Sequence, residues 1–406
     1  MINLENISKI GIGTYRMSID NEDHKEALEC AIDYGINLID SASNYQNGNS
    51  EQLIGKIIDK KTRKKVFIIT KAGYIQNNDL YKLSLIKPDQ TIKINDNFYY
   101  SIEESFISLQ IKQSLERMNT EYIDCFLIHN PEHYFDIANE FQSEIDNHLI
   151  NIFNFLESLV KLGTIRYYGI SSNNLPNPFS NKFSFEKLLE LKNNFPHFKF
   201  IQFPYNLVES EASVKLYNGY SLIELCKQNN LKCISNRPFN TIYEGKTLKL
   251  INSFINFDEI DEERELELFN SLLKIIQEKL NNIGEVTLVE KFTPIMFLVE
   301  NRKQIGNEEA LDKVIKNYLF PFLKKLDLFD KNTLNLVYLL KREWLLFIKI
   351  NNNYRLSILK DKMEINDEEN LTKYLSSMYL EKGIDHILMG LRKKAYLTKD
   401  LQYFLK

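Results

Sequence analysis

The chain has 406 residues, enough for one large domain with a substantial insertion or for two ordinary domains. Its 55 acidic residues slightly outnumber its 51 basic ones, which argues against a protein that neutralises many nucleic-acid phosphates. No uncharged apolar run approaches the roughly 18 residues that span a bilayer, and residues 1–7 lack the basic and apolar parts of a targeting segment. We therefore expect a soluble, cytoplasmic protein with neither a nucleic-acid nor a membrane partner.

Eight short runs rich in Val, Ile, Phe and Tyr predict buried strands. They lie at residues 9–13, 37–40, 66–71, 123–129, 165–171, 198–206, 232–238 and 386–391. Helical apolar spacing separates them, at residues 24–34, after a capping-box pattern at 101–104, and at 149–162, 185–193 and 222–229. Alternating strands and helices require parallel pairing, and eight repeats close into a (β/α)8 TIM barrel of the α/β class. An open doubly wound sheet is the alternative, although the third glycine of its dinucleotide fingerprint is missing after Gly11 and Gly13.

The connection between the seventh and eighth predicted strands is far longer than the others. Helical spacing at residues 265–280, 334–347 and 368–379 predicts a mostly helical insertion over residues 240–384, with Trp344 among its buried side chains. We thus expect a single barrel over residues 1–406 that contains this insertion. Two roles stay open for the insertion: it could cap the catalytic face, or it could pack outside the barrel or mediate dimerisation.

Four ionisable side chains stand at or just beyond the ends of neighbouring predicted strands. They are Asp40, Tyr45, Lys71 and His129. Each alone has an ordinary explanation, such as a helix cap or a solvated surface. Because barrel enzymes collect their chemistry where strands end, the coincidence of all four indicates one site.

This set of side chains suits the reduction of a carbonyl group. The carbonyl oxygen needs a proton donor, and a phenol with a pKa of about 10 is a poor donor near neutral pH. We expect Lys71, held by Asp40, to lower the pKa of Tyr45, and His129 to donate a hydrogen bond to the same oxygen. The hydride has to come from a cofactor.

The segments around these residues resemble the aldo-keto reductase family. The matching motifs are LIDSASNY at 38–45 with GNSE at 48–51, IITK at 68–71, FLIH at 126–129, YGISS at 168–172, IQFPYN at 201–206 and MGLR at 389–392. The family's tetrad of aspartate, tyrosine, lysine and histidine falls on Asp40, Tyr45, Lys71 and His129. The Asn-Arg-Pro sequence at 236–238 and the His-Asn-Pro-Glu sequence at 129–132 are similar to a less characterised branch. The resemblance covers nearly the whole chain except residues 245–383.

The resemblance implies an NADP(H)-dependent oxidoreductase that interconverts an aldehyde, ketone or sugar carbonyl and an alcohol, with Tyr45 as general acid and base. The cofactor-binding residues expected from it are Gly13, Thr14, Tyr15, Asp40, Ser171, Ser172, Gln202, Asn236, Arg237, Pro238, Gly390, Leu391, Arg392 and Lys393. Arg392 and Lys393 suit a 2′-phosphate, which favours NADP(H) over NAD(H) without excluding the latter.

Four residues depart from the family's usual pattern. Ser172 stands where asparagine is more usual, and Asn236 begins a segment where many members stack an aromatic ring on the nicotinamide. Lys399 and Asp400 replace an acidic–amide pair that often contacts the adenine.

The substrate pocket is expected to be lined by Tyr15, Tyr74 and Asn130, which flank strand ends. Residues 129–133 formally match the H-x-x-E-H zinc-peptidase pattern, but Pro131 disfavours a helical Asn130, so we expect no metal. The alternative to an enzyme is a non-catalytic, cofactor-binding regulatory or accessory subunit on the same barrel. The substrate, the physiological direction and the oligomeric state stay open.

Overall fold

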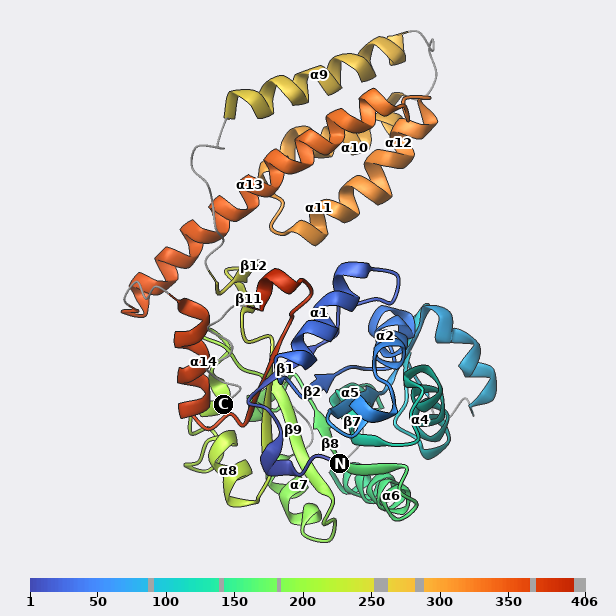
Figure 1. Cartoon of the computed structure of the whole chain (residues 1–406), viewed down its shortest axis with the longest axis vertical. Coiled ribbons are helices and arrows are strands. Elements are labelled where there is room, and N and C mark those ends of the chain that lie inside the picture. Colours follow the sequence, from blue (N-terminus) through green and yellow to red (C-terminus); the bar gives the residue numbers. More distant parts are fainter. Residues whose placement is uncertain are drawn as a thin grey trace. The chain divides into compact units, whose positions relative to one another are not determined.

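A computed structural model describes residues 1–86, 91–138, 142–180, 184–251, 262–281, 288–365 and 370–397. The chain divides into two compact units, one formed by Met1–Phe239 with the segment from Thr372 onward, the other by Asn240–Leu371 (Figure 1). We call them the barrel unit and the helical unit.

The barrel unit is built on eight parallel strands that close in the order β1-β13-β10-β9-β8-β7-β3-β2. The strands are β1 (Ile10–Gly13), β2 (Leu38–Asp40), β3 (Phe67–Ala72), β7 (Ile123–His129), β8 (Ile165–Ser171), β9 (Phe198–Pro204), β10 (Lys232–Asn236) and β13 (His386–Met389). These are the eight predicted strands, so the prediction of a (β/α)8 barrel is confirmed. β9 and β10 end earlier than predicted, β9 at Pro204, whose ring nitrogen has no proton for the ladder, and β10 before Arg237, whose φ of 52° turns the chain away.

Helices connect these strands on the outside of the barrel. They are α1 (Glu22–Asp33), α2 (Asn49–Ile57), α3 (Lys60–Arg63), α4 (Glu104–Met118), α5 (Glu132–Ala138), α6 (Gln142–Lys161), α7 (Phe185–Lys192), α8 (Leu222–Gln228) and α14 (Leu371–Glu381). The capping box predicted at residues 101–104 is wrong, because the helix begins after Glu103 and the Ser101 hydroxyl instead accepts from the Glu103 backbone N–H. A capping box does open α8, at Ser221 and Glu224.

A small antiparallel sheet follows Lys71 and was not predicted from the sequence. It consists of β4 (Tyr74–Gln76), β6 (Phe98–Tyr100) and β5 (Ile92–Asn95), in that order. The alternating run 92–95 followed by the turn residues Asp96 and Asn97 is a hairpin signal that could have revealed it. The sheet pairs Tyr74 with Tyr100 directly beyond the carboxyl end of β3.

The helical unit joins β10 to α14. It opens with a hairpin of β11 (Asn240–Tyr243) and β12 (Lys246–Lys249), whose two turn residues, Glu244 and Gly245, both have positive φ. The helices that follow are α9 (Glu262–Asn281), α10 (Leu288–Asn301), α11 (Glu308–Val314), α12 (Phe320–Lys325) and α13 (Lys331–Lys362). The unit boundary falls at Leu371, short of the predicted end at 384, because α14 is the crossover helix that leads into β13. Residues 366–369 lie outside the described part.

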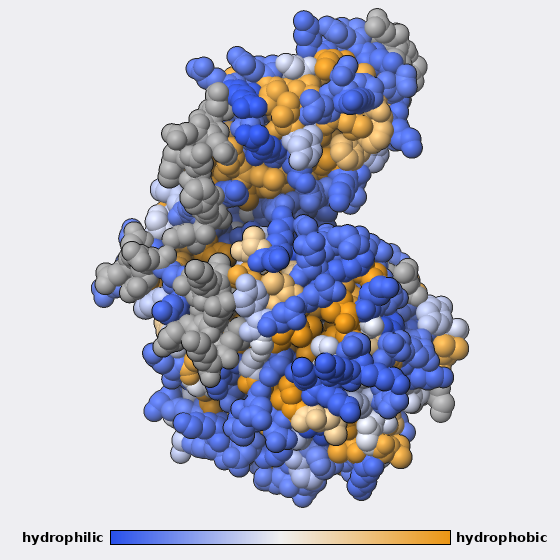
Figure 2. Space-filling view, viewed as in Figure 1, coloured by the Kyte–Doolittle hydropathy of each residue, from blue (hydrophilic) through white to orange (hydrophobic). Residues whose placement is uncertain are grey.

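The helical unit has its own apolar core. Phe269, Leu272, Leu298, Leu323 and Trp344 belong to one buried cluster, which confirms that Trp344 is a core residue. Apolar side chains also remain at the surface of this unit, where Figure 2 shows orange patches. No described helix is both long and apolar enough to cross a bilayer.

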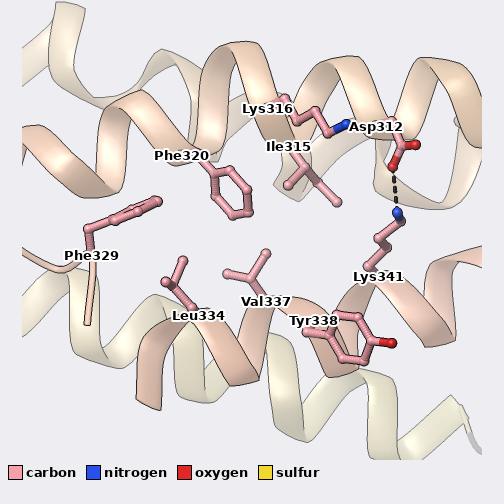
Figure 3. A pocket seen from close by; sticks show the side chains of 9 residues that line it. All are labelled: Asp312, Ile315, Lys316, Phe320, Phe329, Leu334, Val337, Tyr338 and Lys341. Atoms are coloured by element: carbon pink, nitrogen blue, oxygen red, sulfur yellow. Dashed lines mark ion pairs between the residues drawn. The ribbon is translucent and has the colours of Figure 1, made fainter. Parts of the chain in front are cut away.

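A groove of about 300 Å³ lies between α13 and the segment that runs from α11 to α12. Phe320, Leu334 and Val337 form its apolar walls, and an ion pair of 2.6 Å between Lys341 Nζ and Asp312 Oδ1 closes one end (Figure 3).

Candidate active site

The four predicted catalytic residues all lie at the carboxyl ends of barrel strands. Asp40 ends β2, Lys71 is the penultimate residue of β3, and His129 ends β7. Tyr45 begins the short 3-10 helix η2 (Tyr45–Gly48) immediately after β2. Because parallel strands end together, residues from distant parts of the sequence meet at one end of the barrel.

Lys71 is the centre of a buried hydrogen-bond cluster. Its ammonium group, which is 0% exposed, donates to Asp40 Oδ2 at 2.7 Å, to the Ser41 carbonyl at 2.8 Å and to the Tyr45 hydroxyl at 3.2 Å. All three ammonium protons therefore have a partner. The ammonium group is held in place and points its third proton at the phenol oxygen.

Tyr45 is held by an unusual backbone turn. Gln46, Asn47 and Gly48 follow it with φ values of 48°, 57° and 89°, a left-handed run that asparagine and glycine tolerate best. The Tyr45 ring packs edge-on against the Tyr15 ring, with centroids 5.0 Å apart, and lies 6.1 Å from the His129 ring. The phenol is thus bounded by Lys71 on one side and His129 on another.

Burial, rather than the neighbouring ammonium group, dominates the proton affinity of Tyr45. Desolvation, followed by the Asp40 carboxylate and Tyr15, holds the pKa of Tyr45 well above its usual value. The pKa of Tyr45 is therefore raised, whereas we expected from the sequence that Lys71 would lower it. The Asp40 charge offsets that of Lys71, and desolvation of both raises the pKa of Asp40 and lowers that of Lys71.

His129 is a neutral imidazole. Burial, together with the charge of Lys71 and with His133, holds the pKa of His129 well below its usual value. Its Nδ1 atom is buried and finds no hydrogen-bond partner among the described residues. The Tyr74 ring meets the imidazole edge-on at 4.9 Å, and the Tyr100 hydroxyl donates to the His129 carbonyl at 2.8 Å. The ring is fixed by packing, which leaves its polar atoms for a ligand.

Gln202 and Ser171 extend the cluster across the barrel. The Ser171 hydroxyl donates to Gln202 Oε1 at 3.0 Å, and Gln202 Nε2 donates to Asp40 Oδ1 at 2.8 Å. Ser172, predicted to bind cofactor, is turned the other way, and its hydroxyl donates to Glu132 Oε1 at 2.9 Å. Its side chain therefore joins the loop after β8 to the start of α5.

The residues at the end of β10 differ in how far they are free to bind a ligand. Asn236 Oδ1 is buried without a partner in the described part of the chain. Arg237 pairs with Glu209 at 2.9 Å, and the Pro238 carbonyl accepts from the Tyr379 hydroxyl at 3.1 Å. Asn236 is thus the member of this segment with an open acceptor.

At the first and last strands, the predicted residues also lie at strand ends. Gly13 ends β1, and the Thr14 hydroxyl donates to the Asp40 carbonyl at 3.0 Å, which ties the first strand end to the second. Gly390 follows β13 and is exposed, whereas Leu391 is buried.

The two basic residues beyond β13 lie beside α1. Burial lowers the pKa of His24 on α1, and the charges of Arg392 and Lys393 add to this lowering, against the opposing effects of a backbone hydrogen bond from Ser18 and of Asp23. Lys393 is exposed and Arg392 is half-buried, so both cations are open to solvent. Lys399 and Asp400 lie outside the described residues.

Of the predicted substrate-pocket residues, Tyr15 is 58% exposed, whereas Tyr74 and Asn130 are buried. Asn130 Nδ2 donates to the Tyr74 hydroxyl, and its Oδ1 accepts from the Asn173 backbone N–H at 3.0 Å. Both ends of this amide are used inside the protein. Asn130 therefore holds the Tyr74 side chain in place.

Two residues of this network were not predicted to have a role. Tyr100 supports His129 from the unpredicted sheet, and Glu132 binds Ser172 from α5. The sequence signal for Tyr100 was the hairpin pattern at 92–100. Glu132 appeared in the sequence only as part of the His-Asn-Pro-Glu segment and of the zinc-peptidase pattern, and neither gave it a role. The structure breaks the zinc-peptidase pattern, because His129 ends a strand and Asn130 has a φ of 54° before α5 begins.

Comparison with known proteins gives consistent results. A model of the Aldo/keto reductase family matches residues 9–289. The uncharacterized oxidoreductase YqkF of Bacillus subtilis (strain 168) is 27% identical over 166 residues, which cover 41% of this chain and 45% of the relative. Aldo-keto reductase AMT2 of Alternaria alternata is 27% identical over 240 residues, 57% of this chain and 58% of the relative. The chain spans about half the length of these curated relatives.

Among solved structures, the glycerol dehydrogenase AKR11B4 from Gluconobacter oxydans superposes with a TM-score of 0.51. The match covers 98% of this chain and 86% of that structure at 16% identity, a likeness that concerns the fold alone. The family model, in contrast, covers more than half of the sequence and includes all four tetrad positions. On this evidence the chain belongs to the Aldo/keto reductase family.

Proposed function

We propose that this protein is an NADP(H)-dependent oxidoreductase that interconverts a carbonyl group and an alcohol, with Tyr45 as general acid and base. The observation that carries the proposal is the hydrogen-bond chain from Asp40 through Lys71 to the Tyr45 hydroxyl. An ion pair buried only to stabilise the barrel would not need a half-buried phenol as its third partner.

The residues at this end of the barrel fit a nicotinamide nucleotide. Asn236 Oδ1 is an open acceptor, and Gln202 and Ser171 form an amide–hydroxyl pair beside Asp40. Arg392 and Lys393, which are open to solvent, suit phosphate groups. When bound, the nicotinamide supplies the hydride.

The chain's own residues then transfer one proton to the substrate. Tyr45 keeps its proton in the resting chain because burial raises the pKa of its hydroxyl. An alkoxide is a stronger base than a phenolate, so the proton passes from Tyr45 to the substrate oxygen as negative charge develops there. Lys71 then stabilises the phenolate left behind, and His129, which is neutral, can donate a hydrogen bond to the substrate oxygen. Oxidation of an alcohol uses the same groups in reverse.

The test is Tyr45→Phe, assayed with NADPH and a panel of aldehydes, ketones and sugars. We expect kcat to fall about 10³-fold, the range for a lost general acid, while the Kd for NADPH changes less than twofold. Tyr34→Phe, an exposed tyrosine at the end of α1, is the matched control and should keep full turnover. Full turnover in Tyr45→Phe would refute the role given to this residue.

The same assay separates the enzyme from an accessory subunit. A wild-type protein that binds NADPH tightly but turns over none of the panel, and that co-purifies with a partner, would favour the non-catalytic alternative.

The cofactor preference is tested by the double variant Arg392→Ala, Lys393→Ala. We expect the Kd for NADPH to rise about 10- to 100-fold while that for NADH changes little, because only the former carries the 2′-phosphate. Equal losses for both cofactors would contradict a 2′-phosphate site here.

A further inference from the structure

Glu132 is a buried carboxyl group that ties two active-site loops together. It begins α5 just after β7, is 2% exposed, and accepts at Oε1 from the Ser172 hydroxyl at 2.9 Å and the Asn173 backbone N–H at 3.2 Å. Its other oxygen, Oε2, is buried and has no hydrogen-bond partner among the described residues. A buried, half-satisfied carboxyl is costly, so it calls for an explanation beyond packing.

The loop that carries Glu132 also positions the His129 side of the site. The Asn130 backbone N–H donates to the Ser171 carbonyl at 2.6 Å, and the Asn130 side chain joins Asn173 to the Tyr74 hydroxyl. The Tyr74 ring packs on His129. A shift of this loop would therefore move Tyr74 against the imidazole.

The loop after β8, which Glu132 contacts at Ser172, leads to the Asp40 side of the site. Ser172 follows Ser171, whose hydroxyl binds Gln202, which in turn binds Asp40. Because adjacent residues of a strand point to opposite faces, Ser171 serves the barrel interior while Ser172 binds Glu132. Glu132 thus contacts Ser172, the neighbour of Ser171, and hydrogen bonds lead from Ser171 through Gln202 to Asp40 of the tetrad.

We propose that Glu132 is a positioning residue of the reductase site whose single proton controls how tightly the loops after β7 and β8 are held. Burial penalises the carboxylate by more than its hydrogen bonds from Ser172 and Asn173 recover, so the protonated acid keeps the two loops joined and ionisation loosens them. This inference rests on the proposed function.

The surroundings make Glu132 the group of this cluster that changes charge near neutral pH. Burial, against hydrogen bonds from its own backbone and from residues 172–174, raises the pKa of Glu132 from 4.5 to about 7. The β8 loop contributes only Ser172, Asn173 and Asn174, which do not titrate.

The titratable neighbours are shifted away from neutrality. Burial raises the pKa of Tyr74 on β4 and of Tyr100 on β6, so both phenols keep their protons. Burial lowers the pKa of His129 and of His133, so both imidazoles are neutral. Asp136, one turn further along α5, is the remaining charged group on that helix.

The test compares wild type with Glu132→Gln over pH 5.5 to 8.5. Glutamine keeps an acceptor oxygen for Ser172 and Asn173 but cannot ionise, so it imitates the protonated acid. We expect the wild-type KM for a carbonyl substrate to rise about fivefold as pH rises through 7, at nearly constant kcat. Glu132→Gln should match wild type at pH 5.5 and keep that lower KM at pH 8.5.

Glu157→Gln is the matched control. Glu157 on α6 accepts from the Tyr168 hydroxyl and the His197 backbone N–H, before the start of β9 and away from the tetrad. It should leave the wild-type pH profile unchanged. The proposal is overturned if Glu132→Gln retains the wild-type dependence of KM on pH, or if kcat instead carries the whole effect.

An infrared titration gives a readout independent of turnover. Wild type should show the C=O stretch of a buried protonated carboxyl that disappears near pH 7, and Glu132→Gln should lack it. Absence of this band from wild type overturns the proposal. Failure of the proposed function would look different, since no member of the substrate panel would then be turned over at any pH while the infrared band still titrated.

Discussion

The barrel unit and the helical unit each bury an ion pair, but the two pairs have different neighbours. In the barrel, Lys71 pairs with Asp40 at 2.7 Å. In the helical unit, Arg302 pairs with Glu265 at 2.8 Å. Both carboxyl groups are buried, and desolvation penalises all four charges.

The third partner of each pair separates the two cases. Lys71 also donates to the hydroxyl of Tyr45, a half-buried phenol. Glu265 instead accepts from the indole N–H of Trp344 at 2.9 Å, and that side chain is fully buried. The pair in the barrel therefore adjoins a partly exposed hydroxyl, whereas the pair in the helical unit adjoins a fully buried indole.

Lys71→Met should have the largest effect. The variant removes the partner of Tyr45 and leaves Asp40 buried without a counter-ion, so we expect kcat/KM to fall at least 10³-fold. The barrel should also lose about 3–5 kcal/mol of stability, less if Asp40 takes up a proton. Steady-state kinetics and urea unfolding measure the two effects. A loss of turnover below tenfold would break the distinction between the two pairs.

Arg302→Met tests the helical unit. Glu265 would keep Trp344 but lose its counter-ion, and we expect this unit to lose about 3 kcal/mol of stability. Trp344 is the only tryptophan in the chain, so its fluorescence follows the unfolding of this unit directly. Turnover at 25 °C should stay within twofold of wild type. A Trp344 transition that does not move would show that this pair contributes nothing to stability.

Protonation of Glu132 should give the smallest effect on stability. Its pKa is about 7 in the folded chain against 4.5 in the unfolded chain, so between these values the folded state holds a proton that the unfolded state has released. Stability should therefore fall as pH rises from about 4.5 to 7, by about 3 kcal/mol or less.

Glu132→Gln should lack this dependence. Urea midpoints of both proteins at pH 5 and pH 8 measure the difference. A gap between the two proteins that is equal at both pH values would contradict the raised pKa.

Much of the candidate site could be predicted because its residues sit in short local motifs. Asp40 and His129 each end an apolar strand, Lys71 is the last but one residue of another, and Tyr45 follows a fixed distance after Asp40. Parallel strands that close into a barrel bring their ends together without further information. The convergence of the tetrad was therefore accessible from the order of elements alone.

The proton affinity of Tyr45 was not accessible in the same way. The sequence places an ammonium group near the phenol, which alone would lower its pKa. The fold also buries the phenol and sets Asp40 beside it, and these two effects outweigh the ammonium group. Desolvation depends on every atom that excludes water, so it has no local signature in the sequence.

The eight strands, the presence of a helical insertion and the residues at the strand ends could be predicted from the sequence, because periodicity and motif spacing are properties of neighbouring residues. The support of Tyr74 by Asn130, the hydrogen bond from Ser172 to Glu132 and the place of α14 in the barrel unit became visible in the folded chain. Hydrogen bonds between loops join residues some 40 to 56 positions apart, and their choice of partner depends on how those loops meet in space.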